Sequence, residues 1–202
     1  LLELGDKSPE VLFMKGEVML AHGDIDRALS FYGESYDKGF ITGRLRIVSI
    51  LINRGQIDSA AFLLDSIDKE AERLLDYSME TAGMKIIRGQ DADSLLDMVI
   101  RKAVTVTNRT PDDPRPYLVL GKAYSLMNDY EKSMYYLNTA YFLEDSPFNQ
   151  AFIVLEMGKA EDLLGDRERA SNFYRQIIEL DGGEYQKTLA EEYLKSPFRR
   201  KR

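Results

Sequence analysis

Cysteine is absent from this chain of 202 residues, and His22 is its only histidine. Without cysteine, no disulfide, thiolate nucleophile or sulfur-ligated metal can form, and a single histidine excludes a two-histidine metal site. A Ser-His-Asp triad would have to include His22, which lies in a predicted turn where a cation near a helix C-terminus is the simpler interpretation. The sequence therefore predicts no catalytic residue and no metal site. The lack of cysteine fits a reducing cytoplasm but excludes no compartment.

Further absences narrow the class of protein. No apolar run approaches the roughly 18 residues that a membrane-crossing helix needs, so no membrane span is expected. The sequence contains no calcium-loop spacing, glycine-rich phosphate loop or zinc-binding helix motif, and we therefore predict no cofactor and a non-enzymatic protein. The formal net charge of -7 argues against a nucleic-acid-binding protein, because such proteins neutralise phosphates with lysine and arginine.

The segment from Pro114 to Pro147 predicts two amphipathic helices joined by a break at Asn128-Asp129. In its first half, apolar residues recur at the i, i+3, i+4, i+7 spacing of one helix face. Its second half has a small residue at each end of a similar stripe, where two helices would approach closely. The first stripe is Tyr117, Leu120, Gly121 and Tyr124, and the second is Ser133, Leu137 and Ala140.

This segment resembles the tetratricopeptide repeat family, whose unit of about 34 residues carries a large residue, Leu-Gly and Tyr in its first helix, then Ala, an aromatic residue and Ala in its second. Tyr117 takes the place of the family's Trp, and Leu137 takes the place of its aromatic residue. The pattern fits four more segments, two of them degenerate because Val48 replaces the small residue and Leu95 replaces an alanine. The small-residue positions are Gly16, Val48, Gly83, Gly121 and Gly158, separated by 32, 35, 38 and 37 residues, which brackets the family period.

The resemblance implies an all-α fold, a right-handed superhelical α-solenoid of antiparallel helix pairs in which residues 1–202 form a single array. Five repeats are expected, at about 9–40, 41–72, 76–107, 114–147 and 148–182. Residues 184–195 are predicted to form a terminal capping helix, or alternatively the first helix of a further unit. Residues 196–202 form a basic tail, interpreted as a solvated end, with a membrane-surface or nucleic-acid role as the alternative.

Three segments interrupt or flank the regular pattern. Residues 108–116 contain three prolines and are predicted to form an inter-repeat loop, or alternatively a hinge between a three-repeat and a two-repeat block. Residues 69–88 contain no strong breaker, so the helix that opens the third repeat is expected to begin early. Residues 1–6 resemble the end of a second helix, and we therefore expect the sequence to be a piece of a longer array.

In arrays that resemble this family, the first helices line the concave face, and solenoids use such faces for binding. The resemblance implies a protein–protein interaction scaffold that binds a peptide or helical segment of a partner along this groove, with the partner's apolar side chains against the apolar members of the face. The alternative is a self-assembly module that forms homo-oligomers through the array ends or the convex face. The residues projected onto the concave face are Phe13, Glu17, Leu45, Ser49, Ile52, Tyr77, Met84, Arg115, Leu118, Lys122, Phe152, Leu155 and Lys159.

One use known in the family concerns peptide carboxylates. Chaperone-binding members clamp the terminal carboxylate of a peptide with cationic and asparagine side chains on successive first helices. The corresponding places of the first repeat hold Phe13 and Glu17, and because a glutamate would repel a carboxylate, we reject this clamp for the first three repeats. A weaker anion grip from Arg115, Lys122 and Lys159 is the remaining expectation, whereas the sequence does not identify the partner.

Overall fold

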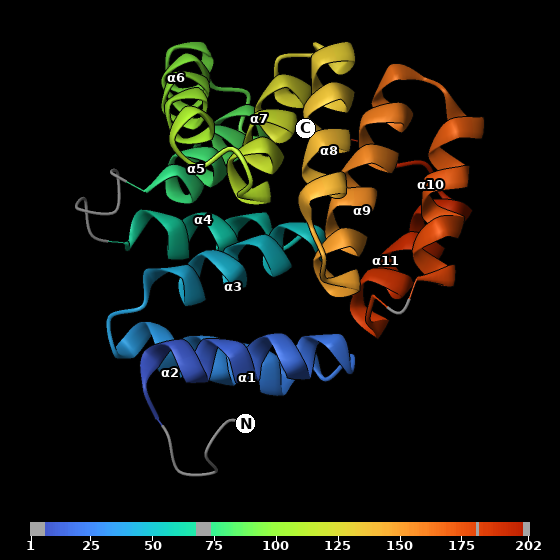
Figure 1. The fold of residues 1–202 in the computed structure, drawn as a ribbon. Helices are drawn as coiled ribbons and strands as arrows, with labels where there is room; N and C mark the ends of the chain where they lie inside the picture. Colours follow the sequence, from blue (N-terminus) through green and yellow to red (C-terminus); the bar gives the residue numbers. More distant parts are fainter. Residues whose placement is uncertain (1–6, 68–73, 181, 200–202) are drawn as a thin grey trace. The chain divides into compact units, whose positions relative to one another are not determined.

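The computed structural model of the protein describes residues 7–67, 74–180 and 182–199, and every regular element in these ranges is an α-helix (Figure 1). The predicted all-helical fold of paired helices is therefore confirmed for the described part of the chain. The helices are α1 Pro9–Ala21, α2 Ile25–Asp37, α3 Ile41–Asn53, α4 Ile57–Asp65, α5 Leu75–Ile87, α6 Asp93–Arg109, α7 Pro114–Leu126, α8 Tyr130–Leu143, α9 Pro147–Leu164, α10 Arg167–Glu179 and α11 Glu184–Lys195.

Two of the predictions concern residues outside the described ranges. The resemblance of residues 1–6 to a helix end, and the early start of the helix in the third repeat at residues 69–73, both fall there. Helix α5 is described from Leu75 onward. None of the helices in the described ranges combines the length and the apolar character needed to cross a bilayer.

The chain divides into two compact units, Leu1–Glu80 and Thr81–Arg202, called unit 1 and unit 2 below, and the division falls inside α5. Unit 1 contains α1 to α4, and unit 2 contains α6 to α11. Within unit 2, α6 packs against α7, α8 against α9 and α10 against α11. Residues 108–116 therefore lie inside unit 2, and the boundary between the units does not coincide with the predicted hinge.

In the α1–α2, α7–α8 and α9–α10 pairs, the turn combines a left-handed residue with a capping aspartate. Asn128, between α7 and α8, has a φ of 62° and is the non-glycine residue with a positive φ among the described residues, while Gly165 fills the same place between α9 and α10 with a φ of 92°. Asparagine and glycine tolerate this conformation better than other residues. The aspartate that follows each, Asp129 or Asp166, accepts a hydrogen bond from the backbone N–H three residues further on, at 3.2 and 3.0 Å. The short Asn-Asp and Gly-Asp sequences thus end one helix and start the next.

The predicted close crossings of the two helices are confirmed in three pairs. A Cβ atom added to Gly121 would lie 2.6 Å from the side chain of Leu137, so the second helix packs directly on the glycine backbone. The pairs with this contact are Gly16 with Tyr32, Gly121 with Leu137 and Gly158 with Tyr174. Gly83 differs, because the nearest atom to its added Cβ would be a Leu126 methyl 4.0 Å away. Bulk is therefore excluded at the three crossings but not at Gly83.

Candidate functional site

The first-helix face of unit 2 carries a partly buried ion pair on α9. The Lys159 ammonium lies 2.9 Å from the Glu156 carboxylate, and the lysine side chain is only 10% exposed. Burial opposes the charge on Lys159, but the facing carboxylate outweighs burial and raises the pKa of the ammonium. Burial also opposes the charge on Glu156, yet Lys159 and Lys122 of α7 hold the pKa of that carboxyl below its usual range. The two charges therefore stabilise each other inside the unit.

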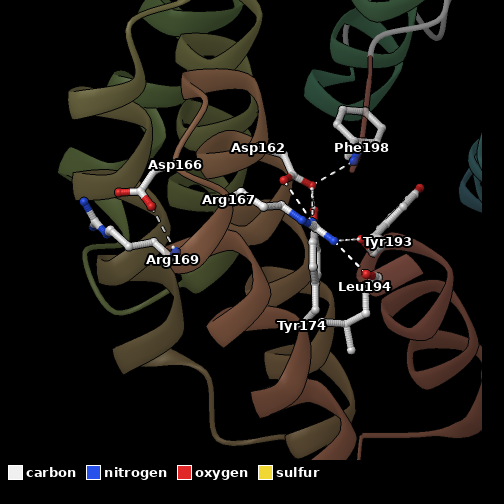
Figure 2. Close-up of polar contacts among 8 residues, drawn as sticks. All are labelled: Asp162, Asp166, Arg167, Arg169, Tyr174, Tyr193, Leu194 and Phe198. Atoms are coloured by element: carbon white, nitrogen blue, oxygen red, sulfur yellow. Dashed lines mark hydrogen bonds and ion pairs between the residues drawn. The ribbon is translucent and has the colours of Figure 1, made fainter. Parts of the chain in front are cut away.

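Asp162, one turn further along α9, binds two residues of α10 and one residue of the segment after α11 (Figure 2). Its carboxylate accepts hydrogen bonds from the Arg167 guanidinium at 3.1 and 3.2 Å, from the Tyr174 hydroxyl at 2.9 Å and from the backbone N–H of Phe198 at 2.7 Å. The aspartate side chain is 1% exposed. Burial and donation to this carboxylate raise the pKa of Tyr174, so the hydroxyl keeps its proton. Asp162 thus fixes α10 and the segment after α11 to α9.

Arg167 also holds the end of α11. Its second terminal nitrogen donates to the carbonyl oxygens of Tyr193 and Leu194 at 2.6 and 2.8 Å, which are among the last carbonyls of that helix. A helix leaves its last carbonyls without partners inside the helix, and a cation there also complements the helix dipole. Figure 2 shows Arg167 between Asp162 and this helix end. One guanidinium therefore sets where the chain leaves α11.

After α11, the chain folds back onto α9. Ser196 has extended backbone angles, and Pro197 cannot continue the helix. The Phe198 ring then lies edge-on to the Tyr193 ring, 5.4 Å between centroids, and the Lys159 ammonium is 5.4 Å from the Phe198 centroid. The interpretation of this segment as a solvated end is therefore wrong for Phe198, because that residue closes on α9. Residues 200–202 lie outside the described ranges. We call the surface formed by Lys159, Asp162 and Tyr193 the Phe198 site.

Unit 1 contains a comparable carboxylate on α1. Glu17 accepts two hydrogen bonds from Arg46 of α3, at 2.8 and 2.9 Å, and one from the Tyr32 hydroxyl of α2 at 2.6 Å. Burial opposes the charge on Arg46, but Glu17 outweighs it and raises the pKa of the guanidinium. Glu17 is therefore committed to two neighbouring helices of its own unit.

The structure separates the predicted concave-face residues into two groups. Leu45, Met84, Leu155 and Lys159 are buried by the chain itself, so a partner cannot reach them as expected, because neighbouring elements already cover these positions. The others keep some accessible surface: Phe13, Glu17, Ser49, Ile52, Tyr77, Leu118, Lys122 and Phe152 are partly buried, and Arg115 is exposed.

The expected anion grip loses two of its three cations to partners within the chain. Arg115 binds Asp113 with hydrogen bonds from two nitrogens, the shortest 2.7 Å, and these bonds hold the pKa of Asp113 below its usual range. Lys159 is paired with Glu156, and the third cation, Lys122, also acts on Glu156. All three cations therefore already interact with carboxylates of the chain, and we do not propose an anion site at these residues.

Three residues that shape the site were not singled out from the sequence: Arg46, Arg167 and Phe198. Each makes at least one hydrogen bond to a residue 26 or more positions away in the chain, and helical spacing gives no signal at that range. Across the described residues, no group of three or more histidines or acidic side chains could hold a metal ion. The arrangement around Asp162 is suited to holding a polypeptide segment by its backbone and by one aromatic side chain.

The tetratricopeptide repeat family model matches residues 114–142. Among curated proteins, the Photosystem I assembly protein Ycf3 of Acaryochloris marina (strain MBIC 11017) is 30% identical over 90 residues, which are 45% of this chain and 54% of that protein. The matched region thus spans about half the length of this relative.

Two solved structures are similar in fold. A thermophilic TPR protein of Thermus thermophilus matches with a TM-score of 0.56 at 16% identity, over 93% of this chain and 98% of that chain. A fragment of MamA from Desulfovibrio magneticus RS-1, residue 41 to its end, matches with a TM-score of 0.40 at 18% identity, over 87% of this chain and 96% of that chain. The chain therefore contains a tetratricopeptide repeat at residues 114–142 and shares the fold of the Thermus protein.

Proposed function

We propose that the chain is a protein-interaction scaffold and that unit 2 binds an extended segment of a partner protein on the first-helix face of α7 and α9. Proteins built from tetratricopeptide repeats are generally non-enzymatic scaffolds for protein–protein interaction. The face, the extended form of the ligand and the residues that contact it are the specific parts of the proposal.

The observation that carries the proposal is the chain's own segment 196–199, which lies on α9. Its backbone is extended at Ser196, its Phe198 N–H donates to Asp162, and its aromatic ring rests on Tyr193 beside Lys159. These contacts are the kind by which proteins recognise extended peptides, with main-chain hydrogen bonds for affinity and a side-chain pocket for specificity. A partner segment with an aromatic residue could therefore take the same place.

The rest of the face offers apolar surface next to the Phe198 site. Leu118 of α7 and Phe152 of α9 are both partly buried, which leaves part of each side chain accessible. Apolar surface that stays accessible beside polar groups often marks an interaction site. The same two residues were predicted to contact the partner, and they remain in the proposal, whereas Leu45, Met84 and Leu155 do not.

The relative from Acaryochloris marina is named as an assembly protein for photosystem I. That name supports the general class proposed here, a protein that acts by holding other polypeptides. Because the match spans about half of the relative, the proposal extends to the class and not to the complex that the relative assembles.

The test uses a labelled peptide with the sequence of residues 196–199 and follows its binding by fluorescence anisotropy. The peptide should bind the Phe198→Ala chain, whose own segment no longer fills the site, and should bind the unaltered chain about tenfold more weakly, because only the fraction with a vacant site is competent. A matched peptide with alanine in place of phenylalanine should not bind. Phe142→Ala removes another aromatic side chain of unit 2, one that is 82% exposed, and serves as the control variant.

Two results would overturn the proposal. One is equal binding of the peptide to the Phe198→Ala chain, the Phe142→Ala chain and the unaltered chain, which would place the peptide elsewhere. The other is no binding to the Phe198→Ala chain while its circular dichroism and melting temperature match those of the unaltered chain.

Self-assembly is a second candidate function, favoured by two aromatic side chains on α8. Tyr135 is 67% exposed and Phe142 is 82% exposed, and large exposed aromatic residues are enriched at interfaces. Light scattering across a dilution series should show a dimer that dissociates on dilution and that Phe142→Ser abolishes. A monomer at every concentration would exclude this candidate.

A further inference from the structure

A pocket lies at the end of unit 2 where the α7–α8 turn meets the α9–α10 turn. Its volume is about 660 Å³. Figure 2 shows Arg169, one of its lining residues, pointing away from the Asp162 cluster, so the pocket is distinct from the Phe198 site. The lining residues are Met127, Asn128, Asp129, Tyr130, Glu131, Met134, Glu161, Leu164 and Arg169.

The wall of this pocket contains a buried carboxylate whose hydrogen-bonding capacity is unused. The Glu161 side chain is 1% exposed, and neither of its oxygens has a hydrogen-bond partner among the described residues. Arg169 lies 2.8 Å from one oxygen, which makes an ion pair but does not satisfy hydrogen-bond geometry. A buried carboxylate is costly unless it is both paired and hydrogen-bonded. A cationic group that could donate hydrogen bonds to Glu161 would therefore stabilise this carboxylate more than Arg169 does.

Arg169 holds this carboxylate loosely. Its side chain is 57% exposed, and exposed arginine side chains lose considerable conformational freedom when they are held in one geometry. Its backbone is fixed separately, because the Arg169 N–H caps the turn on Asp166 at 3.0 Å. The guanidinium can therefore leave Glu161 without unfolding the start of α10.

The remaining lining suits a cation on a long apolar stem. Met127 is 40% exposed and Leu164 is 56% exposed, so both offer apolar surface beside the acid. Glu131 adds an exposed negative charge, while Asp129 is already paired with Lys132 at 2.7 Å. Lysine and arginine side chains lay their methylene stems along apolar surface and keep the charged group for an acidic partner. The chain's net charge of -7 also favours basic partners.

We propose that this pocket binds a lysine or arginine side chain of a partner polypeptide, which takes the place of the Arg169 guanidinium on Glu161. The proposal is independent of the Phe198 site, since it uses the other side of α9 and different residues. It assigns to unit 2 a second contact point, specific for a basic residue.

The test follows methionine methyl resonances while small probes are added to the full chain. The probes are N-acetyl-arginine methylamide and N-acetyl-lysine methylamide, with N-acetyl-norleucine methylamide as the uncharged control of similar stem. The cationic probes should shift the Met127 and Met134 methyl signals with saturation and leave Met14, an exposed methionine of unit 1, unchanged. The norleucine probe should shift none of them. A preference between the two cationic probes identifies the side chain.

Two variants should change the binding of the cationic probes in opposite directions. Glu161→Gln keeps the shape of the side chain and removes the charge, so it should abolish the shifts, and it should fold because Glu161 makes no hydrogen bond that would be lost. Arg169→Gln removes the competing cation and should strengthen binding several-fold. Glu168→Gln, an exposed acid beside Arg169, is the matched control and should bind like the unaltered chain. Binding that survives Glu161→Gln, weakens in Arg169→Gln or is equal for the norleucine probe would overturn the proposal.

Discussion

Glu17 in unit 1 and Asp162 in unit 2 are two carboxylates with similar neighbours and different final partners. Each lies on a first helix, each accepts a hydrogen bond from a tyrosine of the following helix, and each binds an arginine. The last partner differs. Glu17 gives both oxygens to the side chain of Arg46, whereas Asp162 also accepts the main-chain N–H of Phe198.

The difference shows what the repeat pattern determines and what it leaves open. In both places, a glycine of the first helix contacts the tyrosine ring, so the crossing fixes the tyrosine hydroxyl. The acid sits next to the glycine in unit 1, at Glu17, and one turn further along in unit 2, at Asp162. An acid that meets a neighbouring arginine joins helices, and an acid that keeps an oxygen for an N–H can hold a polypeptide segment.

Removing either carboxylate should have the largest effect on stability, and the loss should be greater for Asp162 than for Glu17. Asp162→Ala should lower the free energy of unfolding by about 3 kcal/mol, at the lower end of the cost of breaking a buried ion pair. Glu17→Ala should cost about 2 kcal/mol, because the Glu17 side chain is 17% exposed, against 1% for Asp162, and is therefore partly hydrated. Urea denaturation followed by circular dichroism measures both.

A second measurement separates the two carboxylates by function. Asp162→Ala should release segment 196–199 and speed limited trypsin cleavage after Lys195, while Glu17→Ala should leave that cleavage rate unchanged. Asp166→Ala, which removes only a helix cap, should cost about 1 kcal/mol and is the control. Equal cleavage in both variants would mean that the N–H contact does not retain the segment.

The helix crossings beneath these carboxylates can be tested at a pair that has no acid. Gly121→Leu should lower the free energy of unfolding by roughly 1 to 3 kcal/mol, because the new side chain would overlap Leu137. Gly83→Ala is the matched case, and since its Cβ meets nothing closer than 4.0 Å, it should stabilise the chain by up to about 1 kcal/mol through helix propensity. An unchanged melting temperature in Gly121→Leu would show that the assigned register is wrong.

Removing the tyrosine hydroxyls should lower stability by a smaller amount, and by a similar amount in the two units. Tyr32→Phe and Tyr174→Phe each remove one hydrogen bond to a carboxylate, at 2.6 and 2.9 Å. Each should cost about 1.5 kcal/mol, the lower range for hydrogen bonds to charged groups. Thermal melts of the two variants should therefore shift by similar amounts. A shift in only one of them would show that the tyrosines are not equivalent.

The smallest effect concerns pH and compares two further carboxylates on α9 itself. Burial opposes ionisation of both, but Lys159 and Lys122 lower the pKa of Glu156, whereas burial raises the pKa of Glu161 despite Arg169. Ionised Glu156 therefore contributes stability above the ordinary glutamate pKa of about 4.3, and this contribution is lost as the pH falls through its lowered pKa. Ionised Glu161 instead destabilises the folded state, because its pKa is raised there, and its protonation on acidification favours folding.

The matching variants are Glu156→Gln and Glu161→Gln. At pH 7, Glu156→Gln should lower the melting temperature and Glu161→Gln should raise it slightly or leave it unchanged. The Glu161→Gln difference should shrink as the pH falls toward 4, because the raised pKa of Glu161 lets that carboxyl become neutral first. The Glu156→Gln difference should persist until the pH falls below about 4.3, because the lowered pKa keeps Glu156 ionised in the folded state. Melts of the two variants and the unaltered chain at pH 7, 5.5 and 4 provide the measurement, and a Glu161→Gln variant that melts lower at pH 7 would contradict the assignment.

The fold could be predicted from the sequence because its determinants are local and periodic. Gly16, Gly121 and Gly158 recur at near-regular spacing, and each marks a crossing that the structure contains. The helix-pair turns at Asn128 and Gly165 are likewise determined by two or three consecutive residues. Signals of this kind need no knowledge of distant contacts.

The candidate site was only partly predictable, because burial on the first-helix face depends on elements far along the chain. The repeat position of Lys159 gives its direction on α9, but not that Tyr193 and Phe198 cover it. In the same way, Glu17 was expected to repel an incoming carboxylate, while its actual partner, Arg46, lies on α3. Helical spacing assigns a side chain to a face, and only tertiary packing decides whether that side chain is available.

Because segment 196–199 folds back onto α9, a partner ligand must compete with it and needs a minimum affinity to displace it. A ligand joined by a short flexible connection is present at an effective concentration on the order of millimolar. A partner at micromolar concentration must therefore bind the Phe198 site about a thousandfold more tightly than the chain's own segment to fill half of the molecules. The covalent connection thus makes the site selective for strong or locally concentrated partners, without any contact that acts against the weak ones.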